Sequence, residues 1–329
     1  MRSENHACVS QKIVILGTGG TIAGLSLIPG AGGAYRAAQV GIEDLLKQSA
    51  ALPPKASTKP ANASEAVTEM SLTLVSEQLA QVDSKDMDEA IWQRLLTRLA
   101  QLQADPQVQG VVITHGTDTL EETGFLLQAC WPEGKPIVLT CAMKPADAPD
   151  ADGPANLKHA IQTASEPHLT GVHMVCDGQR FAGHAFQKLK TDGVQPFVSQ
   201  LPDGTEPAYV PLTASELSRV LQAQVWPRVE IVMNHAGAEG SLVRALLTAP
   251  GLPTLHGLVL AGTGQGTYSE KLGQALRQAQ AQGVRVCRTT RALLGSVQPV
   301  AGAEFPSVPW TPVKARVAMM LDALSGRTA

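Results

Sequence analysis

The chain has 329 residues, of which 44% are hydrophobic, and its net charge is −3. This length is enough for two domains of ordinary size, and the slightly acidic balance excludes a strongly basic surface for nucleic acid. No apolar run is long enough to span a membrane, and residues 1–11 lack the apolar core of a secretion signal, so we expect a cytoplasmic protein.

Cysteine and histidine usage gives no sign of a metal centre. The five cysteines are scattered without a Cys-x-x-Cys pair, and the eight histidines show no spacing typical of metal ligands. We therefore expect reduced thiols, no metal and no other cofactor.

The first predicted strand, residues 12–16, leads directly into a glycine-rich turn at 17–24. A dinucleotide-binding loop would need a third glycine where the chain has Ile22, and a phosphate-binding loop would need a lysine at the end of the turn. The turn fails both tests. We expect its glycines to let the backbone approach a small ligand, and the hydroxyls of Thr18 and Thr21 to supply the chemistry.

The next segment, residues 25–36, is rich in small residues and has no helical or strand period, so we expect a mobile flap over the ligand site. It carries Tyr35, one of only three tyrosines. A tyrosine is more often structural, but a phenol beside a threonine-bearing turn can carry a proton. Farther along we predict a helix at 41–48, a loop at 50–63 and an edge strand at 67–75.

An acidic segment then precedes an amphipathic helix. The apolar positions of this helix are Met87, Ile91, Leu95, Leu99 and Leu102. Asp83, Ser84 and Asp86 can be caps of the helix or can bind a polar group of a ligand, and the residue pattern leaves both readings open.

The most informative stretch is residues 110–124, where a β-branched strand stops at Gly116 and a helix begins at Leu120. The loop between them carries Thr117 and Asp118. Such residues often only cap a helix, but in an α/β sheet a loop of this kind leaves the carboxyl end of a strand, where ligand crevices form. If this strand and the first one lie in one parallel sheet, both loops open on the same edge and their polar side chains can meet.

Helices and strands alternate through the rest of the chain. We predict helices at 120–130, from 154, and at 215–225, 241–247, 269–282 and 313–324, with strands at 135–140, 171–176, 230–233, 257–261 and 284–289. This alternation favours an α/β fold of two α/β domains with largely parallel sheets.

Prolines concentrate at 198–228. We therefore expect a larger N-terminal domain at 1–205, a linker at 206–228 and a smaller C-terminal domain at 229–329.

A threonine hydroxyl is a poor nucleophile at neutral pH and needs a group that takes its proton. Asp118, Tyr35 and Lys188 can do so, and Lys188 would act as a base only if burial lowered its pKa. Lys188 lies in a predicted loop at 181–197, where a lysine is usually only solvated.

Two motifs resemble those of a known family. Residues 18–24 (Thr-Gly-Gly-Thr-Ile-Ala-Gly) and 114–123 (Thr-His-Gly-Thr-Asp-Thr-Leu-Glu-Glu-Thr) are similar, in order and spacing, to the two signature motifs of bacterial-type L-asparaginases, a family that includes the glutaminase-asparaginases. Further similar segments are 83–87, 142–145, 151–157 and 261–266, so the likeness extends over residues 12–325.

The resemblance implies an amidohydrolase that converts L-asparagine to L-aspartate and ammonia, with L-glutamine as an alternative substrate. It implies that Thr21 is the nucleophile, with Tyr35 beside it. Thr117, Asp118 and Lys188 would form a second triad that activates a hydroxyl or a water.

The resemblance also implies how the substrate is held. Ser84 and Asp118 would bind the α-carboxylate and the α-ammonium, and the backbone near Ala142 would line the amide pocket. The implied substrate-contacting positions are Gly20, Asp83, Ser84, Lys85, Thr117, Asp118, Ala142 and Gln265. A homotetramer built from dimers is implied as well, in which pairs of subunits complete each site.

The chain departs from the family pattern at several positions. Lys85 stands where many members have Gln or Ser, Cys141 replaces a common glycine and Lys144 a common arginine. Gln265 stands where members often have an asparagine that reaches a neighbouring subunit, and Glu304 is assigned to the acidic residue that some members contribute across that interface. These departures bear on substrate affinity and on the ratio of asparagine to glutamine use.

Other functions stay open at the level of sequence. A non-catalytic amino-acid sensor would keep the pocket without needing the full set of Thr21, Tyr35, Thr117, Asp118 and Lys188. The same chemistry could act on another amide, such as glutamine or an amide of a larger partner. A nucleotide-binding protein is the least favoured, because the glycine-rich turn at 17–24 fails the spacing test.

Overall fold

The computed structural model describes residues 11–28, 34–50, 72–199 and 208–327. The middle of the predicted flap, most of the predicted loop at 50–63 and the start of the predicted edge strand lie outside these residues. Residue contacts divide the chain into two compact units. The first unit comprises residues 1–120, 131–182 and 190–196, and the second comprises 121–130, 183–189 and 197–329.

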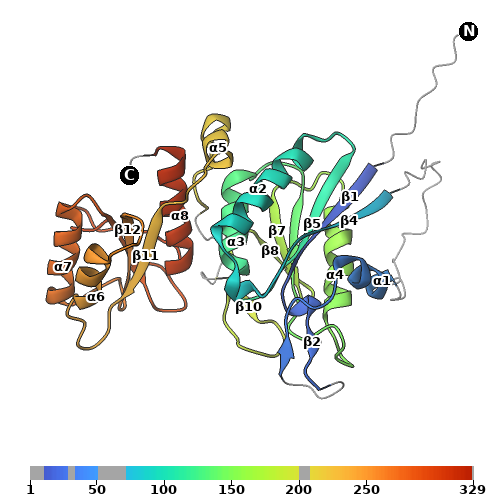
Figure 1. Ribbon diagram of the computed structural model, residues 1–329, viewed down its shortest axis with the longest axis horizontal. Helices are drawn as coiled ribbons and strands as arrows, with labels where there is room; N and C mark the ends of the chain where they lie inside the picture. Colours follow the sequence, from blue (N-terminus) through green and yellow to red (C-terminus); the bar gives the residue numbers. More distant parts are fainter. Residues whose placement is uncertain (1–10, 29–33, 51–71, 200–207, 328–329) are drawn as a thin grey trace, which may run out of the picture. The chain divides into compact units, whose positions relative to one another are not determined.

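The first unit is built on a six-stranded sheet (Figure 1). In spatial order its strands are β4 (Leu72–Val82), β1 (Gln11–Gly19), β5 (Val108–Thr114), β6 (Ile137–Thr140), β7 (Val172–Cys176) and β8 (Gln179–Ala182). The first five run parallel, and β8 pairs antiparallel with β7. The predicted edge strand is therefore confirmed as β4, although it extends to Val82.

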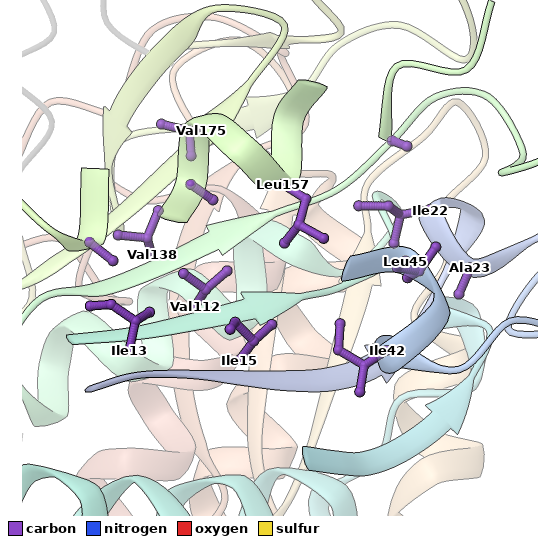
Figure 2. Close-up of a cluster of buried hydrophobic side chains, with 13 residues drawn as sticks. Ile13, Ile15, Ile22, Ala23, Ile42, Leu45, Val112, Val138, Leu157 and Val175 are labelled. Carbon is purple, nitrogen blue, oxygen red and sulfur yellow. The ribbon is translucent and has the colours of Figure 1, made fainter. Parts of the chain in front are cut away.

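Helices α1 (Ile42–Ala50) and α4 (Gly153–Ala164) pack on one face of this sheet. Because successive side chains of a strand point to opposite faces, Ile13 and Ile15 of β1 share a face. They join residues of both helices in one buried apolar cluster, which Figure 2 shows. Ile22 and Ala142 belong to the same cluster, so the core reaches the loops at the carboxyl ends of β1 and β6.

Helix α2 (Glu89–Ala104) is capped by a residue that the sequence reading did not select. The Asp88 carboxylate accepts a hydrogen bond from the N–H of Ile91 at 2.8 Å. Asp83, Ser84 and Asp86 lie before this cap, so the reading of those three residues as caps of the helix is wrong. Met87 also lies outside the helix, whereas the other predicted apolar positions are buried in it.

The second unit contains a three-stranded parallel sheet in the order β11 (Arg228–Met233), β12 (Leu255–Gly262), β13 (Arg285–Thr290). Its other elements are α5 (Ala214–Leu221), α6 (Ser241–Thr248), α7 (Glu270–Ala281), α8 (Pro312–Ser325), the short antiparallel pair β9 (Gln187–Lys188) and β10 (Phe197–Val198), and nearly all of α3 (Leu120–Cys130). The predicted α/β fold with largely parallel sheets is confirmed. The domain boundary at 205 stays a prediction.

A lysine with no exposed surface lies inside the second unit. Lys314 of α8 donates a hydrogen bond from Nζ to the carbonyl oxygen of His184 at 2.8 Å, and Nζ lies 5.9 Å from the centroid of the Phe186 ring.

Glu121 of α3 is a buried carboxyl in the same unit. Burial raises the pKa of the Glu121 carboxyl to about 7, although the charge of Lys314 and the backbone N–H of Lys188 favour its ionised form.

This raised pKa predicts a pH-dependent stability. The folded protein keeps a proton on Glu121 above the ordinary carboxyl pKa of 4.5, so the free energy of unfolding falls as the pH rises from there to about 7. Glu121→Gln keeps an acceptor oxygen for the Lys188 N–H and removes the charge. We expect the variant to be more stable than the parent by roughly 1–3 kcal/mol at about pH 8, with no gain at about pH 4.

Urea unfolding at both pH values measures this difference. Glu133→Gln, at an exposed carboxyl, serves as the control and should leave the pH dependence of stability unchanged. An equal gain at both pH values for Glu121→Gln would contradict the assignment to Glu121.

Candidate active site

The two threonine-bearing loops leave neighbouring strands on the same edge of the sheet. β1 and β5 pair in parallel with Gly17 opposite Thr114, so both loops begin at the carboxyl ends of their strands. The hydroxyl of Thr18 donates a hydrogen bond to the carbonyl oxygen of Thr114 at 2.8 Å and links the strands at that point. The condition set in the sequence analysis, that these two strands lie in one parallel sheet, is met.

The two loops approach each other at a pair of glycines. Gly20 has a φ of 82°, in the region that favours glycine, and a Cβ placed on it would lie 2.3 Å from both N and Cα of Gly116. A Cβ on Gly116 would in turn lie 2.4 Å from Oγ of Ser84. These glycines therefore allow one loop of the chain to touch the other.

Thr21 begins a single 3₁₀ turn, Thr21–Ala23, directly after β1. Its side chain is only 6% exposed, and its Oγ1 lies 2.8 Å from the phenolic oxygen of Tyr35. The next residue, Ile22, is buried in the apolar cluster of Figure 2 and anchors the turn. A phenol at hydrogen-bond distance can help to move the proton of a threonine hydroxyl.

Tyr35 lies on a short two-stranded ribbon. β2 (Leu25–Ser26) and β3 (Tyr35–Arg36) pair antiparallel, and Ser26 is opposite Tyr35. The described ends of the predicted flap thus form a ribbon. Its mobility stays a prediction.

Ser84 comes from a third strand end at the same edge of the sheet. It begins the 3₁₀ turn Ser84–Asp86 just after β4, and its side chain is buried. Its Oγ accepts a hydrogen bond from the N–H of Asp118 at 3.2 Å, and its carbonyl oxygen accepts one from the hydroxyl of Thr119 at 2.8 Å. Thr117 is buried in the same loop, whereas Asp118 is exposed. The structure therefore brings the Thr117 loop and the Ser84 turn together.

Lys85 and Asp83 lie beside Ser84 at the surface. Nζ of Lys85 forms ion pairs with Oδ2 of Asp83 at 3.0 Å and Oδ2 of Asp86 at 2.8 Å. Hydrogen bonds to Asp86 and Asp83 raise the pKa of the Lys85 ammonium, so its positive charge is balanced by its own neighbours.

His115 is a residue of the second motif that sequence reasoning did not assign. It is fully buried, and burial lowers its pKa to about 4, so the imidazole is neutral at physiological pH. Its Nδ1 lies 2.7 Å from the carbonyl oxygen of Gly116, which can only accept, so Nδ1 carries the proton of this hydrogen bond. His115 is thus an internal support of the loop. Its place at the end of a buried strand is the signal that could have indicated this.

Ala142 is buried in the loop that follows β6, and two polar residues of α4 and its N-cap hold this loop. The Asp152 carboxylate accepts the N–H of Lys144 at 3.0 Å, and Nδ2 of Asn156 donates to the carbonyl oxygen of Cys141 at 3.0 Å. Sequence reasoning also missed these two supports, because the bonds depend on the fold of the loop.

Three predicted positions belong to the second unit. Lys188 lies on β9, opposite Phe197 of β10. Gln265 is exposed, and its Oε1 accepts the N–H of Gln298 at 3.0 Å. The Glu304 carboxylate binds Arg277 of its own chain at 3.0 Å.

Within the described parts of the chain, no group of three or more His, Cys, Asp or Glu side chains is arranged to hold a metal ion. No helix in the same parts is long and apolar enough to cross a membrane.

Comparisons with known proteins cover nearly the whole chain. The family model described as "Asparaginase, N-terminal" matches residues 12–207, and the one described as "Glutaminase/Asparaginase C-terminal domain" matches residues 228–327. The L-asparaginase 2 of Bacillus subtilis (strain 168) is 32% identical, over 94% of this chain and 82% of that protein. The glutaminase-asparaginase of Pseudomonas fluorescens biotype A is 30% identical, over 86% and 76%.

A solved structure is similar as well. The crystal structure of a probable cytoplasmic L-asparaginase from Campylobacter jejuni has a TM-score of 0.79 and 29% sequence identity, and the match covers 95% of both chains.

Proposed function

The chain belongs to the asparaginase family, and from this premise we propose how it converts L-asparagine and water to L-aspartate and ammonia. The glutaminase-asparaginase among its relatives supports a side activity on L-glutamine, whose side chain ends in the same amide. The observation that carries the mechanism is the 2.8 Å contact between Thr21 Oγ1 and the phenol of Tyr35, in a nearly buried turn at the carboxyl end of a parallel strand.

In the first step the Thr21 hydroxyl attacks the carbon of the side-chain amide. Its proton leaves through the Tyr35 hydroxyl, which the short contact supports. The amide nitrogen takes up this proton and departs as ammonia, and the aspartyl group remains bound to Thr21 as an ester. In the second step water attacks this ester and releases L-aspartate.

The second group of proposed catalytic residues is Thr117, Asp118 and Lys188. In this proposal Lys188 takes a proton from the hydroxyl of Thr117, or from a water beside it, and Asp118 orients the lysine. The family resemblance supports this assignment.

Ser84 and Asp118 hold the ends of the substrate in our proposal. Because Ser84 Oγ already accepts the Asp118 N–H, its own proton can be donated to the substrate α-carboxylate. The exposed Asp118 carboxylate carries the charge that attracts the α-ammonium. The further substrate-contacting positions that we propose are Gly20, Asp83, Lys85, Thr117, Ala142 and Gln265.

An ammonia-release assay with L-asparagine, L-glutamine and D-asparagine tests this function. We expect the fastest release from L-asparagine, slower release from L-glutamine and the least from D-asparagine, because Ser84 and Asp118 fix the handedness of the α-carbon. Binding of L-aspartate without hydrolysis of any amide at high enzyme concentration would favour the non-catalytic sensor instead.

We also infer a cytoplasmic homotetramer built from dimers. The cytoplasmic designation of the similar Campylobacter jejuni protein supports the location, and the family resemblance supports the assembly. Light scattering should give the mass of four chains.

A further inference from the structure

Asp147 is an exposed residue of the loop between β6 and α4, and it binds the ribbon that carries Tyr35. Its Oδ1 accepts hydrogen bonds from both the backbone N–H and the hydroxyl of Ser26, each at 2.9 Å. One residue earlier, the N–H of Ala146 donates to the carbonyl oxygen of Gly24 at 2.8 Å. The loop is therefore attached both to the first strand of the ribbon, at Ser26, and to Gly24, the residue just before that strand.

Ser26, which Asp147 binds, is connected through Tyr35 to the proposed nucleophile Thr21. Ser26 is the register partner of Tyr35 in the ribbon, and the Tyr35 hydroxyl lies 2.8 Å from Oγ1 of Thr21. The described strands of the ribbon have two residues each, and a two-stranded ribbon of this size is not stable by itself in water. Its position over Thr21 depends on what holds it from outside.

The carboxylate of Asp147 is well suited to hold the ribbon in place. Hydrogen bonds from Ser26, first of all from its backbone N–H, lower the pKa of Asp147, so the group is ionised at neutral pH. Hydrogen bonds to an ionised acceptor are stronger than those between neutral groups. The loop is also held internally. The carboxylate of Asp152, at its end, accepts a hydrogen bond from the N–H of Lys144, near its start.

We propose that Asp147 is a positioning residue of the reaction, which holds Ser26 and thereby keeps the Tyr35 hydroxyl on Thr21. The inference rests on the proposed function, in which Thr21 is the nucleophile and Tyr35 moves its proton. It adds a residue that touches neither the substrate nor the nucleophile.

Replacing Asp147 tests the idea in the full-length protein. We expect Asp147→Ala to lower kcat for L-asparagine about tenfold, with a change in KM below about threefold, because two charge-assisted hydrogen bonds are lost. Asp147→Asn keeps an acceptor oxygen and should restore most of kcat. Ser26→Ala removes only the hydroxyl bond and should lower kcat by roughly twofold to fivefold.

Asp150→Ala is the matched control. Asp150 is an exposed carboxylate of the same loop, and it pairs with Lys144 instead of the ribbon. The variant should leave kcat unchanged. A loss of kcat in Asp150→Ala as large as that in Asp147→Ala would show a general effect on the loop and would overturn the proposal.

A double-mutant cycle separates positioning from simple stabilisation. In a Tyr35→Phe background, Asp147→Ala should lower kcat less than about twofold, because the hydroxyl to be positioned is absent. An undiminished tenfold loss there, or no loss in the parent background, would overturn the role of Asp147 alone. An unchanged kcat in Tyr35→Phe itself would overturn the proposed role of Tyr35, and this inference with it.

Discussion

Thr21→Ala is expected to lower kcat for L-asparagine by at least about a hundredfold, because the variant lacks the hydroxyl that we propose as the nucleophile. The fold should be retained, since the anchor of the turn is the buried side chain of Ile22 and not the hydroxyl. Ammonia release measures the loss, and the urea unfolding midpoint, which should stay close to that of the parent, measures the fold.

Thr21→Ser is the matched variant for this experiment. It keeps a hydroxyl at the same position and should retain more activity than Thr21→Ala. Normal turnover by Thr21→Ala would refute Thr21 as the nucleophile.

Gly20→Ala is expected to abolish measurable activity and to lower the free energy of unfolding by roughly 2–4 kcal/mol. The new Cβ would lie 2.3 Å from backbone atoms of Gly116, which cannot turn aside as a flexible side chain can. The two motif loops would have to separate, and Thr21 would move with the first of them. Activity and urea unfolding of the same preparation measure both effects.

Gly178→Ala isolates the steric part of this effect. Gly178 has a φ of 74°, similar to the 82° of Gly20, but a Cβ placed on it meets nothing within 4 Å. Its variant should cost only about 1 kcal/mol of backbone strain and leave kcat unchanged. Equal losses in the two variants would mean that strain, and not contact with Gly116, decides the outcome.

Elements with a strong period could be predicted from the sequence. The last helix, predicted at 313–324, is Pro312–Ser325 in the structure, because its apolar spacing is reinforced by Pro312 in its first turn and by the N-cap Thr311. The segment predicted as a loop at 181–197 instead contains β9 and parts of β8 and β10. Strands of two to four residues are too short to show a period.

In the candidate site, too, local sequence patterns predict some features and miss others. The loops that carry Thr21 and Thr117 could be predicted, because each follows a buried strand and parallel strands open on one edge. The bond between Asp147 and Ser26 joins residues 121 positions apart, and no local pattern marks either of them.

The close contact between Gly20 and Gly116 limits which segments of this protein can be replaced by those of a relative in a chimaera. A chimaera that received only the first motif loop would set a foreign backbone against the native second loop at a point without side chains to absorb a mismatch. Ser84 lies against the same point and would meet the same conflict. Transplanting substrate preference therefore requires moving both loops and the Ser84 turn as one block.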